Sequence, residues 1–196
     1  MTSDNIAAVV LAGGMARRMG GGDKPLLDLA GTRMIERIIA ALELPNIAIS
    51  ANGDPARFAA SGLRVLPDGE FAGEGPLAGV LAGLDWAASL GVRVLLTVPG
   101  DTPFIPRGLA AALAPAPACA ASGNRPHFLV ALWPVTRRDQ LRQMLSAPGR
   151  RDVANFSSLV GARQVDFTTA KWDPFLNVNT PEDLVAARSI AEGKPW

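Results

Sequence analysis

Apolar runs of strand length alternate in this sequence with stretches whose apolar residues recur at helical spacing. The run 6–12 is apolar throughout and ends at Gly13, so it predicts a fully buried first strand. Other apolar runs predict further strands at 47–50, 64–66, 92–98 and 127–133. This alternation is typical of β-α-β units around a mostly parallel sheet, so the sequence predicts the α/β class with no internal domain boundary.

Helices are expected between these strands wherever apolar residues share one face. Thr32 is interpreted as the N-cap of the first helix, because the apolar residues after it follow the i, i+3, i+4, i+7 pattern: Ile35, Ile38, Ile39 and Leu42. Further helices are expected after Gly75-Pro76, from a capping box at 136–139 through Leu145, over 152–160 and from an N-cap at Thr180. The Ala/Pro-rich stretch 113–121 is interpreted as a helix end and a connection.

Composition excludes several classes of function. The 196 residues suffice for one domain with a full core, and 19 Lys and Arg nearly balance 18 Asp and Glu, which argues against a nucleic-acid surface. The single cysteine, Cys119, excludes an internal disulfide and a cysteine-based zinc site. The sequence shows neither an apolar run of the roughly 18 residues that a membrane helix needs nor the pattern of a signal peptide. We therefore expect a soluble, cytoplasmic protein without membrane contact.

The loop after the first strand is rich in glycine and carries three cations. Glycines allow backbone N–H groups to approach a phosphate closely, and the charges of Arg18 and Lys24 can neutralise it. The loop contains neither the G-x-x-x-x-G-K-[ST] pattern of a P-loop nor the G-x-G-x-x-G pattern of a dinucleotide site. It is interpreted as a nucleotide-binding loop of another kind, and the alternative is a flexible basic surface loop.

Polar residues also follow three other expected strands. Asp101 follows a buried strand in the order Pro99-Gly100-Asp101, and one carboxylate together with substrate phosphates is enough to hold Mg²⁺. The alternative is a turn-capping aspartate. Asn52 and Asp68 occupy equivalent positions after their strands, where either could serve only the turn.

Asn177 and Asn179 form the last candidate pair. If this segment is extended, both amides point the same way and can bind the edge of a heterocycle, whereas the alternative is a solvated pair of loop residues. His127 lies in an apolar run beside Phe128, so it is interpreted as a packed histidine, and no Ser-His or Cys-His dyad is evident. Nucleotidyl transfer remains possible without one, since it depends on positioning and charge neutralisation.

The motif L-A-G-G-x-x-x-R-M-G-x-x-x-K, which begins at Leu11, resembles the signature loop of nucleotidyltransferases that activate sugars and cofactors with a nucleoside triphosphate. Together with P-G-D-T-P at 99–103 and N-V-N-T-P-E-D-L at 177–184, it makes nearly the whole chain resemble the molybdenum cofactor guanylyltransferase family. The resemblance implies one Rossmann-like domain over 1–196, with a mostly parallel sheet flanked by helices on both faces. Residues 1–105 would form the nucleotide-binding part and 106–196 the pterin side.

The same resemblance implies an activity. Members of that family transfer a guanylyl group from GTP to the terminal phosphate of molybdopterin or its molybdenum form, release pyrophosphate and require Mg²⁺. The implied catalytic residues are Lys24, Arg18 and Asp101, with Asp101 also the metal ligand. The implied GTP-binding residues are Leu11, Ala12, Gly13, Gly14, Lys24, Asn52, Asp68 and Asp101. The implied pterin-binding residues are Asn177, Asn179 and Arg151.

Three alternatives stay open at this point. They are the cytidylyltransferase relative that uses CTP, a sugar-phosphate or alditol-phosphate nucleotidyltransferase, and a non-catalytic nucleotide-binding or cofactor-delivery module. By resemblance, the pair Gly13-Gly14 favours guanosine, because cytidylyl members tend to carry Ala at the Gly13 position. We expect a monomer that contacts molybdenum cofactor biosynthesis or acceptor proteins only transiently.

Overall fold

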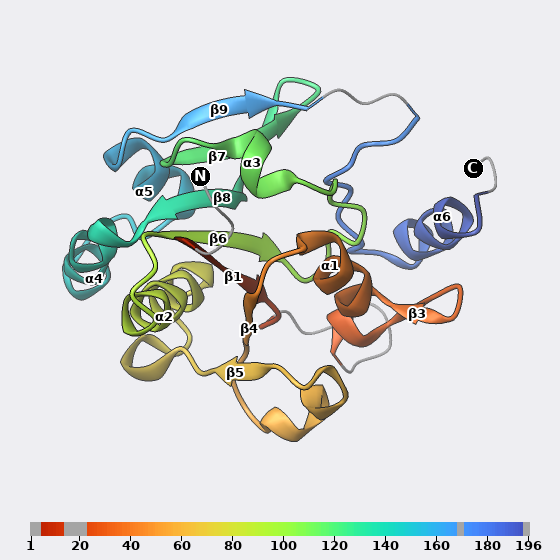
Figure 1. The fold of residues 1–196 in the computed structure, drawn as a ribbon, viewed down its shortest axis with the longest axis horizontal. Helices are drawn as coiled ribbons and strands as arrows, with labels where there is room; N and C mark the ends of the chain where they lie inside the picture. Colours follow the sequence, from red (N-terminus) through yellow and green to blue (C-terminus); the bar gives the residue numbers. More distant parts are fainter. Residues whose placement is uncertain (1–4, 14–22, 168–170, 194–196) are drawn as a thin grey trace.

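The computed structural model describes residues 5–13, 23–167 and 171–193. Seven strands form one sheet in the order β5-β4-β1-β6-β8-β7-β9 (Figure 1). The four strands of this sheet that come first in the sequence pair in parallel. They are β1 (Ile6–Leu11), β4 (Asn46–Ser50), β5 (Arg64–Leu66) and β6 (Val94–Pro99). All four were predicted, and the long apolar runs of β1 and β6 mark strands that are buried on both faces of a sheet.

The other half of the sheet contains a long hairpin. Strand β8 (Arg125–Pro134) is antiparallel to both β6 and β7 (Ala118–Ser122), and β9 (Arg163–Asp166) adds in parallel to β7. The interpretation of 113–121 as a helix end and a connection was therefore wrong from Ala118 onward. Small alanine side chains carry a weak strand signal, but here they are completely buried between two neighbouring strands.

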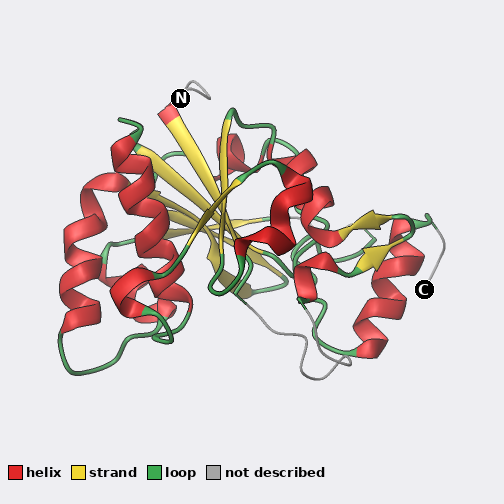
Figure 2. Ribbon diagram, turned by 90° about the horizontal axis from the view of Figure 1, so that it is seen from below, coloured by secondary structure: helices red, strands yellow, loops and turns green. Residues whose placement is uncertain are grey.

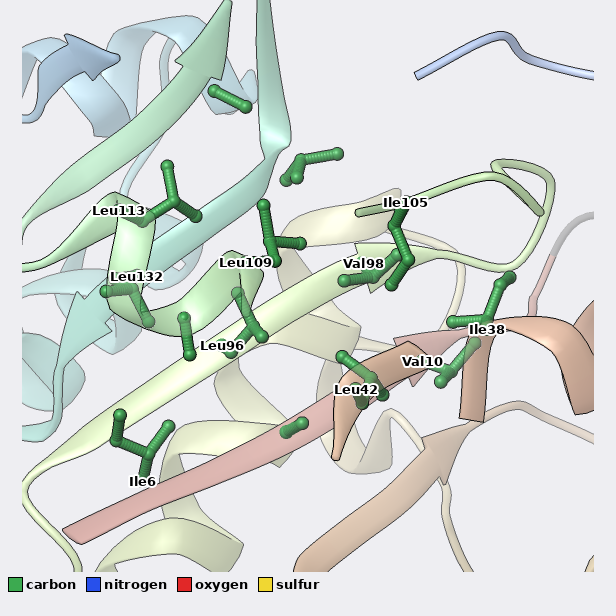
Figure 3. Close-up of a cluster of buried hydrophobic side chains, with 14 of the residues drawn as sticks. Ile6, Val10, Ile38, Leu42, Leu96, Val98, Ile105, Leu109, Leu113 and Leu132 are labelled. Carbon is green, nitrogen blue, oxygen red and sulfur yellow. The ribbon is translucent and has the colours of Figure 1, made fainter. Parts of the chain in front are cut away.

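Helices cover both faces of the sheet (Figure 2). On one face, α1 (Met34–Leu42) packs on β1 and the short α3 (Leu109–Leu113) packs on β7 and β8, and Figure 3 shows part of the buried cluster that they share. On the other face lie α2 (Pro76–Ser89), α4 (Arg138–Ser146) and α5 (Val153–Leu159). This arrangement confirms the predicted α/β class with a mostly parallel sheet.

A smaller layer lies beside the main sheet. The two-stranded ribbon of β2 (Asp28–Leu29) and β3 (Thr32–Arg33) packs on α6 (Pro181–Ala191). Short 3-10 turns complete the fold at Lys24–Leu26, Pro55–Ser61, Gly69–Phe71 and Val135–Arg137. The ribbon was not predicted from the sequence, since two-residue strands leave no apolar period to recognise.

Two of the three predicted helix caps differ in the structure. Thr32 lies in β3, and α1 begins one residue after Arg33, whose N–H donates to Glu36 at 3.0 Å. Residue 136 lies in a 3-10 turn, so α4 begins at Arg138 without the predicted capping box. The cap at Thr180 is confirmed, because its Oγ1 accepts the Asp183 N–H at 3.1 Å.

Candidate active site

A cavity of about 460 Å³ lies beyond the carboxyl ends of β1, β4 and β6. This is the edge of an α/β sheet at which ligands bind, because strand ends and the loops after them converge there. Backbone hydrogen bonds keep the strand ends together, since Ala12 N–H donates to Ser50 O at 2.8 Å and Gly100 N–H donates to Leu11 O at 2.9 Å. The polar residues that follow these strands therefore face one common space.

A partly buried lysine connects two distant parts of the chain at this cavity. Lys24 Nζ lies 2.9 Å from Asp101 Oδ2 and donates to Asn179 Oδ1 at 2.6 Å. The Lys24 side chain is 12% exposed and that of Asp101 21%, so the pair is largely shielded from bulk water. Among the described residues, Asp101 Oδ1 is buried and has no hydrogen-bond partner. The carboxylate thus keeps one oxygen available for a ligand.

The opposite side of the cavity carries a reciprocal amide–carboxylate pair. Asn52 Nδ2 donates to Asp68 Oδ2 at 2.6 Å, and the Asp68 N–H donates to Asn52 Oδ1 at 2.9 Å. Ser50 Oγ adds a bond to the other Asp68 oxygen at 3.2 Å. Arg57 donates to the Asn52 carbonyl and lies 3.4 Å from Asp23, the residue before Lys24. Asn52 and Asp68, which the sequence analysis considered one by one, therefore form a single hydrogen-bonded pair.

The asparagines of the last motif also reach this site. Asn177 lines the cavity and is half-buried, whereas Asn179 is exposed and contacts Lys24. Their segment is attached to the loop after β6, because Val178 N–H donates to Asp101 O at 3.0 Å. The residues expected on the pterin side therefore touch those expected on the triphosphate side.

Other sequence candidates are placed less directly. Arg151 donates to Glu74 at 2.7 Å and to the Ala147 carbonyl at 3.1 Å. It does not line the cavity itself, but the residues on either side of Glu74, Gly73 and Gly75, do. Gly14 and Arg18 lie outside the described residues. Leu11 and Gly13 line the cavity at the end of β1, and Ala12 follows that strand between them.

Two residues that line the cavity, Ser50 and Leu129, were not among the site residues predicted from the sequence. Ser50 ends an apolar strand, so its position was the available signal, whereas Leu129 reaches the site through the unpredicted antiparallel pairing of β8. The sequence also carried no sign of a contact between Ser122 Oγ and His127 Nε2, which lie 2.7 Å apart across the hairpin. His127 itself is packed as predicted, with a side chain that is 7% exposed.

Comparison with known proteins shows the family of this chain. Residues 8–163 match the protein family described as "MobA-like NTP transferase domain". A "Molybdenum cofactor guanylyltransferase" from Acidiphilium cryptum is 51% identical over 190 residues, which cover 96% of each chain. The chain belongs to the molybdenum cofactor guanylyltransferase family. A second relative of that family and name, from Bradyrhizobium, is 44% identical over 205 residues and 97% of each chain.

A solved structure supports the fold assignment within this family. The crystal structure titled "Molybdopterin-guanine dinucleotide biosynthesis protein A", from Archaeoglobus fulgidus, superposes with a TM-score of 0.73 over 95% of this chain and 99% of that one. The two sequences are only 21% identical, so the likeness establishes the shared fold. The Rossmann-like architecture expected from the resemblance is thereby confirmed.

The end of the Asn177–Asn179 segment depends on an ionised carboxylate. Asp183 Oδ2 accepts the N–H groups of Asn179 at 2.9 Å and of Thr180 at 2.8 Å. Partial burial raises the pKa of Asp183, but these hydrogen bonds and the charge of Lys24 outweigh it, so the pKa is lowered overall. A lowered pKa contributes stability above the unfolded-state pKa, and this contribution is lost as the pH falls through the folded-state pKa.

We therefore predict a pH-dependent effect of Asp183→Asn. Near neutral pH the variant should be less stable than the wild type by about 1 kcal/mol, because an amide oxygen accepts the two N–H groups more weakly than a carboxylate does. The difference should shrink as the pH falls through the folded-state pKa of Asp183, because the wild-type carboxyl then becomes neutral as well. Thermal unfolding of both proteins between neutral and acidic pH measures it, with the exposed neighbour Glu182→Gln as control. A difference that stays constant with pH would contradict this role.

Proposed function

We propose that this protein transfers GMP from GTP to the terminal phosphate of molybdopterin or its molybdenum form, with release of pyrophosphate and formation of the guanine dinucleotide cofactor. One observation carries the proposal: Lys24, Asp101 and the Asn52–Asp68 pair surround a single cavity in a chain that is 51% identical to a molybdenum cofactor guanylyltransferase. The cavity volume of about 460 Å³ lies within the range of small-molecule sites.

The transfer is a substitution at the α-phosphorus of GTP. A terminal phosphate oxygen of molybdopterin forms the new bond to this phosphorus, and the bond to the bridging oxygen of the β-phosphate breaks, so that pyrophosphate leaves with the electron pair. The attacking phosphate is already anionic, and no general base is required. Catalysis then rests on positioning and on offsetting the negative charge that gathers on the phosphoryl oxygens.

Lys24 can supply that positive charge. In the structure its ammonium is held by Asp101 and Asn179 at the cavity wall. A phosphate oxygen can replace the carboxylate as its partner, because both accept charge-assisted hydrogen bonds. Arg18 is proposed to assist from the glycine-rich loop, and Gly14 to offer a backbone N–H there.

The residues present fit a Mg²⁺ ion at Asp101. Its buried Oδ1 has no partner among the described residues, and a metal of this kind usually takes one or two carboxylates together with substrate phosphates and water. No group of three or more His, Cys, Asp or Glu side chains in the described ranges could bind a metal by itself. Bound there, Mg²⁺ would offset phosphate charge as a Lewis acid.

The two substrates are proposed to meet between the halves of the chain. Leu11, Ala12 and Gly13, with Asn52 and Asp68, would hold the nucleotide within residues 1–105. Asn177, Asn179 and Arg151 would serve the pterin side within 106–196. The contact between Asn179 and Lys24 supports this arrangement, because it joins the two proposed subsites at the expected position of the reacting phosphates.

The proposal extends to the location, the assembly state and the protein partners of the enzyme. No helix in the described part of the chain has the length and apolar character to cross a membrane. A cytoplasmic location, a monomeric state and transient contact with proteins that make or receive the cofactor stay predictions.

We predict that Lys24→Met and Asp101→Asn each reduce GMP transfer at least about a hundredfold, the usual scale for loss of one group that stabilises transition-state charge. Both side chains lie on loops beyond the strands, so the fold should persist. The assay follows formation of the dinucleotide and pyrophosphate from GTP, molybdopterin and Mg²⁺. Asp166→Asn, which neutralises an exposed carboxylate on β9, is the matched control. A rate within threefold of wild type in either site variant would refute its assigned role.

We also predict that Gly13 influences the choice of base. A Cβ at this position would meet no atom within 4 Å, so Gly13→Ala should leave the fold intact and extend a methyl group into ligand space. A methyl group at this part of the cavity wall should disfavour the larger purine base, and the preference for GTP over CTP should fall several-fold. Competition between the two nucleotides in one transfer reaction measures this ratio. An unchanged ratio with intact GTP binding would show that the base is chosen elsewhere.

A further inference from the structure

A buried polar cluster lies on the antiparallel side of the site, where the mechanism uses none of its groups. Ser122 at the end of β7 faces His127 of β8, with Oγ and Nε2 2.7 Å apart. Ser122 Oγ also donates to Asp173 Oδ1 at 2.8 Å. Ser122 is buried, and the Asp173 side chain, which is 36% exposed, comes from the segment that leads to Asn177.

The direction of these bonds follows from counting protons. An ionised carboxylate only accepts, and the serine hydroxyl has one hydrogen, which goes to Asp173. The lone pairs of Ser122 Oγ are then left for His127, so Nε2 must carry a proton and donate. Burial lowers the pKa of His127, and the charge of Asp173 opposes this only in part. The chain therefore runs from His127 through Ser122 to Asp173, with the imidazole neutral and protonated at Nε2.

This order differs from that of a nucleophilic triad. In a triad, the serine donates to the histidine and the carboxylate accepts from the far ring nitrogen. Here the carboxylate accepts from the serine, and Asp173 Oδ2 lies 4.0 Å from Nε2, the same ring nitrogen that faces the serine. The Ser122 hydroxyl is consequently not activated as a nucleophile. The role of the cluster is instead to hold a neighbouring segment of the chain in place.

What the cluster holds is the start of the Asn177–Asn179 segment. Asp173 Oδ1 also accepts the Phe175 N–H at 2.8 Å, and the Phe175 ring lies 4.9 Å from that of His127. Beyond Asn177 the segment is held again, by the bond from Val178 N–H to Asp101 O and by Asp183. The two asparagines thus lie between anchors on both sides, and the cluster supplies the first anchor.

We propose that Ser122, His127 and Asp173 are positioning residues, which hold Asn177 and Asn179 where the molybdopterin acceptor and Lys24 meet. The inference rests on the proposed guanylyl transfer and adds three residues that contact neither reacting phosphate. Misplacing a substrate-positioning group by about 1 Å can cost up to a hundredfold in rate. Loss of the first anchor should therefore affect the acceptor more than the nucleotide, whose other contacts lie on β1, β4 and β6.

The test compares Asp173→Ala with Asp173→Asn. Asparagine keeps an Oδ1 that accepts from Ser122 and Phe175, whereas alanine removes the acceptor. Asp173→Ala should raise KM for molybdopterin about tenfold with a smaller change in kcat and in the affinity for GTP. Asp173→Asn should stay within about threefold of wild type. Ser122→Ala, which breaks the chain from the other side, should change KM in the same direction, and the exposed Asp166→Ala serves as control.

Two readouts do not depend on activity. Amide exchange at Phe175 and Val178 should accelerate in Asp173→Ala but not in Asp173→Asn, and nitrogen NMR of the wild type should find the His127 proton on Nε2. If Asp173→Asn is as impaired as Asp173→Ala, the negative charge itself is required, and positioning is overturned. Unchanged KM and unchanged exchange in both Asp173→Ala and Ser122→Ala would overturn it as well. If the wild type transfers no GMP, the proposed function fails, whereas amide exchange still decides whether the anchor exists.

Discussion

Three neighbouring strands of this sheet end at the same level, and the site depends on that register. Leu11, the last residue of β1, pairs with Ser50 of β4 on one side and with Pro99 of β6 on the other. Parallel pairing therefore places Asn52 and Asp101 on opposite sides of the carboxyl end of β1. Slipping either strand by one residue would turn its side chains to the other face and separate these groups.

Charge placement explains how so few ionic groups can serve a triphosphate. The chain has almost no net charge, so attraction for an anionic substrate has to come from particular side chains. Lys24 is shielded from water and held by Asp101 and Asn179, and Asp101 keeps a second oxygen without a partner. Phosphate oxygens can take over the bonds of the lysine. The site is thus arranged for its ligand by opposite charges that already neutralise each other in the cavity.

Sequence reasoning worked where burial leaves a simple pattern. Strands β1 and β6 were recognisable from continuous apolar runs, and Asp101 from its place directly after such a run. It failed where the decisive neighbour is distant in the chain. The alanines of β7 become a strand only because β8 and β9 flank them, and Asp166 ends a polar strand with no apolar period. The contact of Asn179 with Lys24 spans 155 residues and was likewise beyond reach.

The central claim is that the α-phosphorus of GTP is the atom attacked, and the fate of its phosphates tests this most directly. The wild-type protein would be given molybdopterin, Mg²⁺ and GTP labelled with radioactive phosphorus at either the α or the γ position. The account predicts that the α label appears in the dinucleotide product and the γ label in pyrophosphate. Transfer of the γ label to molybdopterin, or no incorporation of the α label, would contradict it.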